Sequence, residues 1–198
     1  MEFIKQYLNE TSQIVSCIDI GSIKKAISIL TGVKKNKGRL FILGIGGSSS
    51  TAGHAVNDFR KICNIESYSA TDNSAELTAI TNDSGWENSF CDWLFESNLT
   101  NNDCLLIFSV GGGNLEKNIS RNLIKAVDQA SYSGTRVIGI VGRDGGYVKK
   151  HADATILVPV IEDKRVTPHT EGISAVILHL LVSHPDLYSY PTKWESTK

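Results

Sequence analysis

Short apolar runs recur along the chain, and a cluster of glycines directly follows each of three of them. The runs span 39–43, 104–108 and 136–141, and the clusters are Gly44, Gly46 and Gly47, then Gly111, Gly112 and Gly113, then Gly142, Gly145 and Gly146. Runs that are apolar at every position are typical of central strands in a parallel sheet, because helices cover both faces of such a sheet. A further strand is predicted at 155–158.

Helical spacing of apolar residues follows each glycine cluster. The predicted helices span 52–62, 118–131 and 147–151, and a last helix runs from about Glu171 to Ser183, where His184 and Pro185 end it. The alternation predicts a doubly wound α/β domain over 37–186. Residues 1–36 predict a helical arm that packs on this core or on another subunit, and the tail 187–198 has no assigned structure. Ligands of such sheets bind outside the carboxyl ends of the strands, where all three glycine clusters lie.

Composition and charge narrow the classes of partner. The chain has 20 Lys and Arg against 21 Asp and Glu, a net charge of −1, which gives no electrostatic footprint for nucleic acid. No apolar run approaches the ~20 residues that cross a bilayer, and the acidic, amphipathic start differs from a signal peptide. Four cysteines without a CxxC motif predict buried thiols. We expect a cytoplasmic protein that binds neither nucleic acid nor membrane.

The first two glycine clusters predict an anion site. The first leads into four hydroxyl residues, 48–51, at the start of a predicted helix, where main-chain N–H groups and hydroxyls can bind an anion. It matches neither a Walker A loop nor GxGxxG. The second, 109–114, leaves a row of amides unshielded by side chains. Together they fit a small phosphorylated ligand, and a tight structural turn is the alternative for the first.

Two pairs of titratable residues are candidates for chemistry. His54 and Asp58 are four residues apart, so one helix face carries both, and they could bind a metal, share a proton or form an ordinary surface pair. His179 lies in an apolar stretch, where a hydrogen-bonded core histidine is the alternative. Glu171 opens the same predicted helix and could simply stabilise its N-terminus.

These segments, taken in order, resemble the sugar isomerase (SIS) domain family and, within it, the phosphoheptose isomerases. The resemblance is carried by 44–59, 74–90, 108–114, 137–146 and 169–181. It implies a five-stranded parallel sheet flanked by helices, an N-terminal helical arm, and a homotetramer with active sites between subunits. It also implies an aldose–ketose isomerase that converts sedoheptulose 7-phosphate through an enediol, for heptose in lipopolysaccharide or other surface glycans.

The resemblance also implies roles for individual residues. Substrate contacts are implied for Gly46, Gly47, Ser48, Asn82, Asp83, Ser109, Val110, Gly111, Gly112, Gly113, Asn114 and Glu171, of which 109–114 form the phosphate loop. His54, Asp58, Glu171 and His179 match a site that holds one zinc ion in several members. Asp58 matches the catalytic base and His179 the acid.

Several positions depart from the family pattern. Asp58 and Glu171 replace a Glu and a Gln, the loop 110–114 lacks most of the usual hydroxyls, and Ile62 stands where an arginine is usual, so Arg60 or Lys61 is the candidate substitute. Eight residues separate Glu171 from His179, a helical rise of ~12 Å. Either Glu171 precedes the helix, or two chains contribute, or only one of the two residues is a ligand. The alternative functions are a non-catalytic phosphosugar sensor or protein scaffold, and an isomerase or lyase of another phosphosugar.

Overall fold

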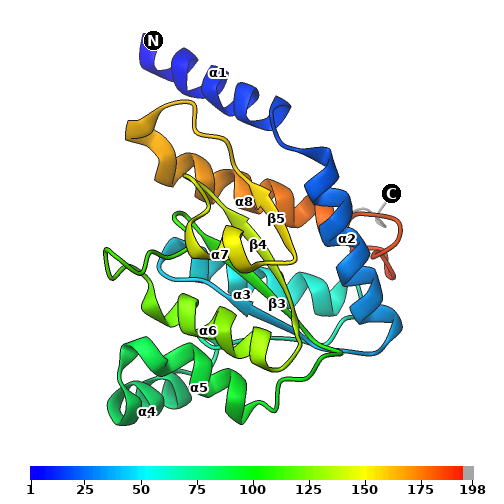
Figure 1. Cartoon of the computed structure of the whole chain (residues 1–198). Coiled ribbons are helices and arrows are strands. Elements are labelled where there is room, and N and C mark those ends of the chain that lie inside the picture. The colour runs from blue at the N-terminus through cyan, green and yellow to red at the C-terminus, as the bar shows by residue number, and fades with distance from the viewer. Residues whose placement is uncertain (194–198) are drawn as a thin grey trace.

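Five parallel strands form the sheet at the centre of the molecule (Figure 1). The computed structural model describes residues 1–193, so the end of the predicted tail, from Trp194 on, lies outside the described residues. The strands are β1 (Leu40–Leu43), β2 (Ser67–Ser69), β3 (Cys104–Ser109), β4 (Arg136–Val141) and β5 (Ala154–Leu157), in the spatial order β2-β1-β3-β4-β5. The predicted five-stranded parallel α/β sheet is confirmed.

Helices cover both faces of the sheet (Figure 1). On one face lie α2 (Ile20–Lys35), α3 (Gly47–Lys61) and α8 (Val166–Val182), and on the other α4 (Ser74–Ser84), α5 (Ser89–Glu96), α6 (Arg121–Tyr132) and α7 (Gly146–His151). Short 3-10 helices at Trp86–Asn88 and Asp163–Arg165 precede α5 and α8. Successive strand side chains enter opposite cores, Leu106 one and Leu105 the other. This alternation explains why the strand runs are apolar at every position.

Three helices begin at other residues than the apolar spacing predicts. Helix α3 begins at Gly47, not at 52, so the hydroxyl residues 48–51 form its first turn rather than a loop. Helix α6 begins at Arg121 because 114–119 closes into a small hairpin, in which Asn114 and Ile119 exchange two main-chain hydrogen bonds of 3.0 and 2.9 Å. Helix α8 begins at Val166, so Glu171 lies inside it rather than at its start.

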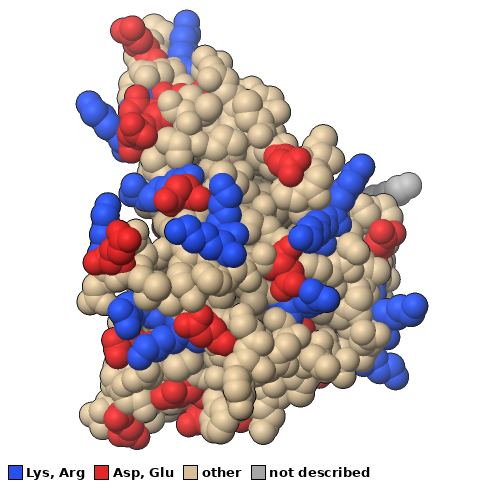
Figure 2. Space-filling model, in the orientation of Figure 1, with Lys and Arg blue, Asp and Glu red and all other residues tan. Residues whose placement is uncertain are grey.

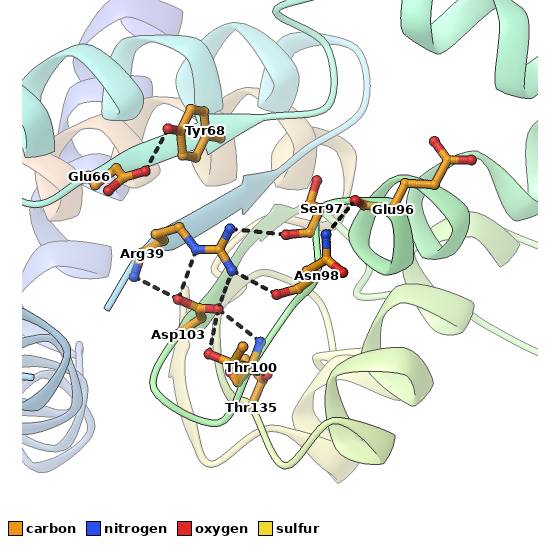
Figure 3. Close-up of polar contacts among 9 residues, drawn as sticks. All are labelled: Arg39, Glu66, Tyr68, Glu96, Ser97, Asn98, Thr100, Asp103 and Thr135. Atoms are coloured by element: carbon orange, nitrogen blue, oxygen red, sulfur yellow. Dashed lines mark hydrogen bonds and ion pairs between the residues drawn. The ribbon is translucent and has the colours of Figure 1, made fainter. Parts of the chain in front are cut away.

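A buried ion pair joins the starts of β1 and β3 (Figure 3). Asp103, 3% exposed, accepts hydrogen bonds from the amide, Nε and Nη2 of Arg39 at 2.8, 3.2 and 2.8 Å, and from the amide and hydroxyl of Thr100 at 2.8 and 2.9 Å. Arg39 also donates to the carbonyls of Ser97 and Asn98. Burial alone would raise the pKa of Asp103, but the bonds from Arg39 and Thr100 hold it below its usual value.

The predicted arm begins with α1 (Glu2–Ser16), which a buried carboxylate fastens to the start of α8 (Figure 1). Arg165 donates to both oxygens of Glu10 at 2.8 and 2.6 Å, and Nε2 of His169 lies 3.0 Å from one of them. These hydrogen bonds, that of Arg165 first, lower the pKa of Glu10 to about 2. The His169 ring also stacks on Tyr7, with centroids 4.4 Å apart. Glu10 is therefore ionised at neutral pH and fixes the position of α1.

Acidic and basic side chains are interspersed over the face seen in Figure 2. Within residues 1–193, no helix combines the length and the apolar character needed to cross a bilayer. All four cysteines are free thiols. Cys63 and Cys104 are buried, as the sequence predicts, whereas Cys17 is exposed and Cys91 is partly exposed.

Candidate active site

The chain leaves the neighbouring strands β1 and β3 towards opposite faces of the sheet. Helix α3 follows β1 and packs on the first face, whereas α6 follows β3 and packs on the second. Such a divergence opens a crevice at the carboxyl ends of the strands, where open α/β sheets bind ligands. Two of the predicted glycine clusters, at 44–47 and 111–113, lie at these strand ends.

A cavity of about 700 Å³ lies at these strand ends. Its lining includes the predicted substrate residues Ser48, Ser109, Val110, Gly111, Gly113 and Asn114. It also includes Lys117, Ser120, Arg143, Asp144 and Thr167, which sequence reasoning did not identify. The amides of Gly111 and Gly113 have no acceptor within the described part of the chain, whereas the Gly112 amide donates to Ser109 Oγ at 3.0 Å. Besides the carboxylate of Asp144, the wall thus carries hydroxyl, N–H and basic groups that can donate to an anion.

Main-chain packing or a positive φ explains four of the six glycines of the second and third clusters, Gly112, Gly113, Gly145 and Gly146. A side-chain carbon at Gly112 would collide with the carbonyl of Gly145, and one at Gly146 would collide with that of Gly111. Gly112 and Gly113 also have φ of +66° and +81°, which favours glycine. Two amides at the start of α7 donate to the carbonyls of Gly112 and Gly113 at 2.9 Å each. The loop after β3 and the start of α7 therefore form one main-chain unit.

Three titratable side chains converge between α3 and α8. His54 and Asp58 lie one turn apart on α3, with Nε2 and Oδ2 separated by 3.1 Å, and Nε2 of His179 lies 3.7 Å from the same oxygen. One ligand atom from each residue lies within 4.8 Å of the others. Asp58 is buried, and Asn57 Nδ2 donates to its Oδ1 at 3.0 Å, whereas the side chains of His54 and His179 are 48% and 56% exposed.

This donor set fits a divalent metal ion. Two imidazoles and a carboxylate suit zinc, and bonds of ~2.0–2.1 Å in tetrahedral geometry separate neighbouring ligand atoms by about 3.3 Å. The observed separations from the Asp58 oxygen, 3.1 Å and 3.7 Å, lie on either side of that value. Three protein ligands with one open position are the usual pattern of a catalytic zinc site.

Glu171 lies apart from this group. Its carboxylate lies against Gly47, where an added side-chain carbon would meet it at 2.6 Å. Helix α8 spans Val166–Val182, so the structure excludes a Glu171 that precedes the helix, and the rise of ~12 Å to His179 applies. Within one chain, the group that could hold a metal is therefore His54, Asp58 and His179.

Asn82, Asp83 and Arg60, for which the family resemblance implies a role, do not lie at the cavity of a single chain. Asn82 and Asp83 are exposed at the end of α4, where the Asn82 amide donates to the Asp83 carboxylate at 2.9 Å, and neither lines the cavity. Arg60, a candidate substitute for the family arginine, lies over the Tyr68 ring, 4.8 Å from its centroid, on the β2 side of the sheet. The basic side chains of the cavity come instead from the 114–119 hairpin and the β4–α7 loop.

Comparison with known proteins shows the family. The model of the SIS domain matches residues 5–142. The chain belongs to the SIS domain family. The match includes His54, Asp58 and the loop 109–114, whereas His179 lies beyond it.

Relatives of this SIS domain protein include proteins named phosphoheptose isomerase. One from a Nitratiruptor species is 31% identical over 154 residues, which are 75% of this chain and 76% of the relative. Another, from Helicobacter pylori, is 29% identical over 164 residues, 80% of each chain. The structure of phosphoheptose isomerase from Neisseria gonorrhoeae matches the fold with a TM-score of 0.77 at 23% identity, over 91% of this chain and 95% of that one.

Proposed function

We propose that this SIS domain protein is an aldose–ketose isomerase that converts sedoheptulose 7-phosphate to D-glycero-D-manno-heptose 7-phosphate. The observation that carries the proposal is that α3 contributes to both parts of such a site: Ser48 lines the cavity, and His54 and Asp58 meet His179 further along. The relatives named phosphoheptose isomerase support the same substrate. The product would supply heptose for lipopolysaccharide or other surface glycans. Free thiols fit a reducing compartment, and we propose the cytoplasm.

Asp58 and His179 are placed to move the two protons that isomerisation requires. The Asp58 carboxylate removes a proton from C1 while His179 protonates the carbonyl oxygen on C2, which gives the enediol. Asp58 then returns a proton to C2, and His179 takes the proton from the oxygen on C1. Burial and the hydrogen bond from Asn57 hold the carboxylate in one orientation. The half-exposed His179 ring can reach a sugar oxygen from the solvent side.

The same three side chains would hold a zinc ion, one per active site. When bound, the ion polarises the substrate carbonyl. Asp58 can combine both roles because Oδ2 faces the two histidines, while Oδ1 keeps a lone pair besides the one that accepts from Asn57. His179 would hold the ion through Nε2, which lies 3.7 Å from Oδ2, so the nitrogen that exchanges protons with the sugar oxygens would be Nδ1. Glu171 contacts the sugar where it lies against Gly47, and a role as a fourth metal ligand would require a second copy of the chain.

The phosphate of the substrate would occupy the cavity at the start of α3. The hydroxyls of Ser48 and Ser109 and the amides of Gly111 and Gly113 are the donors on that wall. From there the sugar would extend along α3 past Glu171 to the His54 group. Asn82 and Asp83 would then belong to a site completed by another subunit.

Exposed apolar side chains lie beside His179 on α8. They support an oligomer in which two subunits form each active site. Val176 and Leu180 are 50% and 42% exposed and lie on the same face of α8 as His179. Helix α1, which packs on α8, adds Phe3, Ile4 and Leu8, exposed by 60%, 61% and 64%, respectively. Contiguous exposed apolar surface marks an interaction site. The chain is therefore proposed to form a homotetramer in which a second copy covers these apolar side chains of α8.

Val176→Glu is expected to dissociate the oligomer and to abolish isomerase activity while the fold is retained, because a charge would replace an apolar interface residue. Light scattering after size exclusion, circular dichroism and activity assays at several protein concentrations measure these effects. Tyr132→Glu, which changes a side chain 89% exposed at the end of α6, is the control and should alter neither property. An active Val176→Glu monomer would argue against a shared site.

Turnover itself is the direct test of the function. Purified protein in D2O should convert sedoheptulose 7-phosphate to the aldose, followed by NMR, with deuterium at C2 wherever the proton on Asp58 exchanges with solvent before it is returned. Chelation should abolish this activity until zinc is restored. A folded protein without turnover, with or without zinc, would instead support a phosphosugar-binding module, which the missing hydroxyls at Val110 and Gly111 favour. Turnover of a different phosphosugar would support the other alternative, an isomerase or lyase of that phosphosugar.

A further inference from the structure

Two basic side chains of the cavity have no counter-ion. Arg143 and Lys117 line the cavity, and neither forms a side-chain hydrogen bond or an ion pair with any residue from 1 to 193. Three other arginines are paired with carboxylates, in Arg39–Asp103, Arg136–Asp153 and Arg165–Glu10, whereas Arg60 lies over the ring of Tyr68. The lining also contains one carboxylate, Asp144, whose Oδ1 accepts a hydrogen bond from the Gly146 amide at 3.1 Å. The two cations outnumber this carboxylate, and an excess of positive charge on a concave wall attracts an anionic ligand. The positive charge of the cavity is thus available to a ligand.

Arg143 lies beside Gly111. In the 111–113 loop, this is the one glycine that neither a close main-chain contact nor a positive φ demands. A side-chain carbon at Gly111 would lie 3.7 Å from Cδ of Arg143, an ordinary contact, and Gly111 does not have a positive φ. The family pattern has a serine at this position. The absence of a side chain at Gly111 leaves space for the arginine against the loop that would bind the phosphate.

Local hydrogen bonds fix the turns from which both side chains extend. Arg143 has φ +52°, and its turn is closed by the Gly145 amide, which donates to the carbonyl of Gly142 at 2.9 Å. A non-glycine residue keeps such a conformation where the surrounding structure imposes it. The Lys117 amide donates to Asn114 Oδ1 at 2.8 Å inside the hairpin that projects before α6 in Figure 1. Both cations therefore stand on ordered turns at the rim of one cavity.

We propose that Arg143, assisted by Lys117, binds the phosphate of the substrate in place of the hydroxyls that 110–114 lacks. A guanidinium can donate two parallel hydrogen bonds to phosphate, and a lysine adds a second positive charge. The identity of the phosphosugar rests on the proposed function, but the contact between these cations and phosphate does not require turnover.

Binding of inorganic phosphate to the purified protein, measured by calorimetry, tests the inference. Arg143→Gln is expected to weaken phosphate binding about 10- to 100-fold, since a charge-assisted hydrogen bond is lost. Lys117→Gln should weaken it about two- to fivefold, because its side chain is exposed on the hairpin. Lys150→Gln is the matched control, because it removes an equal charge from exposed α7 outside the cavity lining and should leave binding within about twofold.

Two further variants separate recognition from folding. Arg143→Lys keeps the charge and should retain part of the affinity. Gly111→Ser in the Arg143→Gln background adds a hydroxyl where the structure has space and should restore part of it. Wild-type phosphate affinity in Arg143→Gln, or an equal loss in Lys150→Gln, would overturn the inference. Phosphate binding that depends on Arg143 without any isomerase turnover would refute the proposed function alone, whereas turnover with phosphate binding independent of Arg143 would refute this inference alone.

Discussion

Replacing His179 with alanine is expected to lower kcat for isomerisation by about 10²- to 10⁴-fold, the range that a general acid contributes. The side chain is 56% exposed, so the stability of the fold should change by no more than ~0.5 kcal/mol. KM should change less than kcat, because the cavity with Ser48 and Ser109 is untouched. Steady-state kinetics with sedoheptulose 7-phosphate and thermal unfolding measure both quantities.

His184→Ala is the matched control for this prediction. His184 follows the end of α8, outside the group formed by His54, Asp58 and His179, and its replacement should leave kcat unchanged. Zinc content, measured by mass spectrometry on the same samples, separates the two roles of His179. A variant that keeps its zinc but loses turnover supports the acid, and one that loses both supports a ligand. Full activity of His179→Ala would refute the proposed acid.

Replacing Asp103 with alanine is expected to lower the free energy of unfolding by about 3–5 kcal/mol, because Arg39 is left without its buried partner. That is a large part of the 5–15 kcal/mol that typically stabilises a domain. Urea denaturation followed by circular dichroism measures it. Since the pKa of Asp103 lies below its usual value in the folded state, the difference between the two proteins is complete at neutral pH. This difference in the free energy of unfolding should become smaller as the pH falls below about 3.9, the usual pKa of an aspartate, and through the lowered pKa of Asp103.

The chain contains a second aspartate–arginine pair that serves as its control. Asp153 contacts Arg136, which is 66% exposed, and accepts a hydrogen bond from the amide of Val137 at 2.8 Å. Asp153→Ala should therefore cost only about 1 kcal/mol. Equal losses for the two variants would mean that burial of Asp103 does not set the strength of its pair.

Most of the sheet could be predicted from the sequence because its central strands are apolar on both faces. The runs at β1, β3 and β4 are continuous, and each ends in glycines at the ligand-binding edge. Strand β2 gives no such signal, because it is an edge strand of three residues, two serines around Tyr68. Of the five strands, β2 is the one implied only by the family resemblance. Helices α4 and α5 were not predicted from apolar spacing.

The candidate site could be predicted only where its residues are near one another in sequence. The spacing of His54 and Asp58 predicts a pair on one helix face, and the family pattern adds His179, but their convergence requires α8 to pack on α3. The sequence gives only a weak indication of Arg143, which is a basic residue within the third glycine cluster. Lys117 left none, because the hairpin that brings it to the cavity depends on main-chain pairing between Asn114 and Ile119.

The main-chain contact between the 111–113 loop and the start of α7 has a consequence for how this protein can evolve. Gly112 and Gly146 cannot accept side chains without separating the two segments, and Gly113 has a positive φ and lies against Ile124 of α6. The shape of this end of the cavity is therefore inherited as a unit. A change of substrate must then come from the positions around it whose side chains can vary, such as Val110, Gly111 and Arg143. The residues that preserve the shape of the site and those that can select a new ligand are thus different residues of the same two loops.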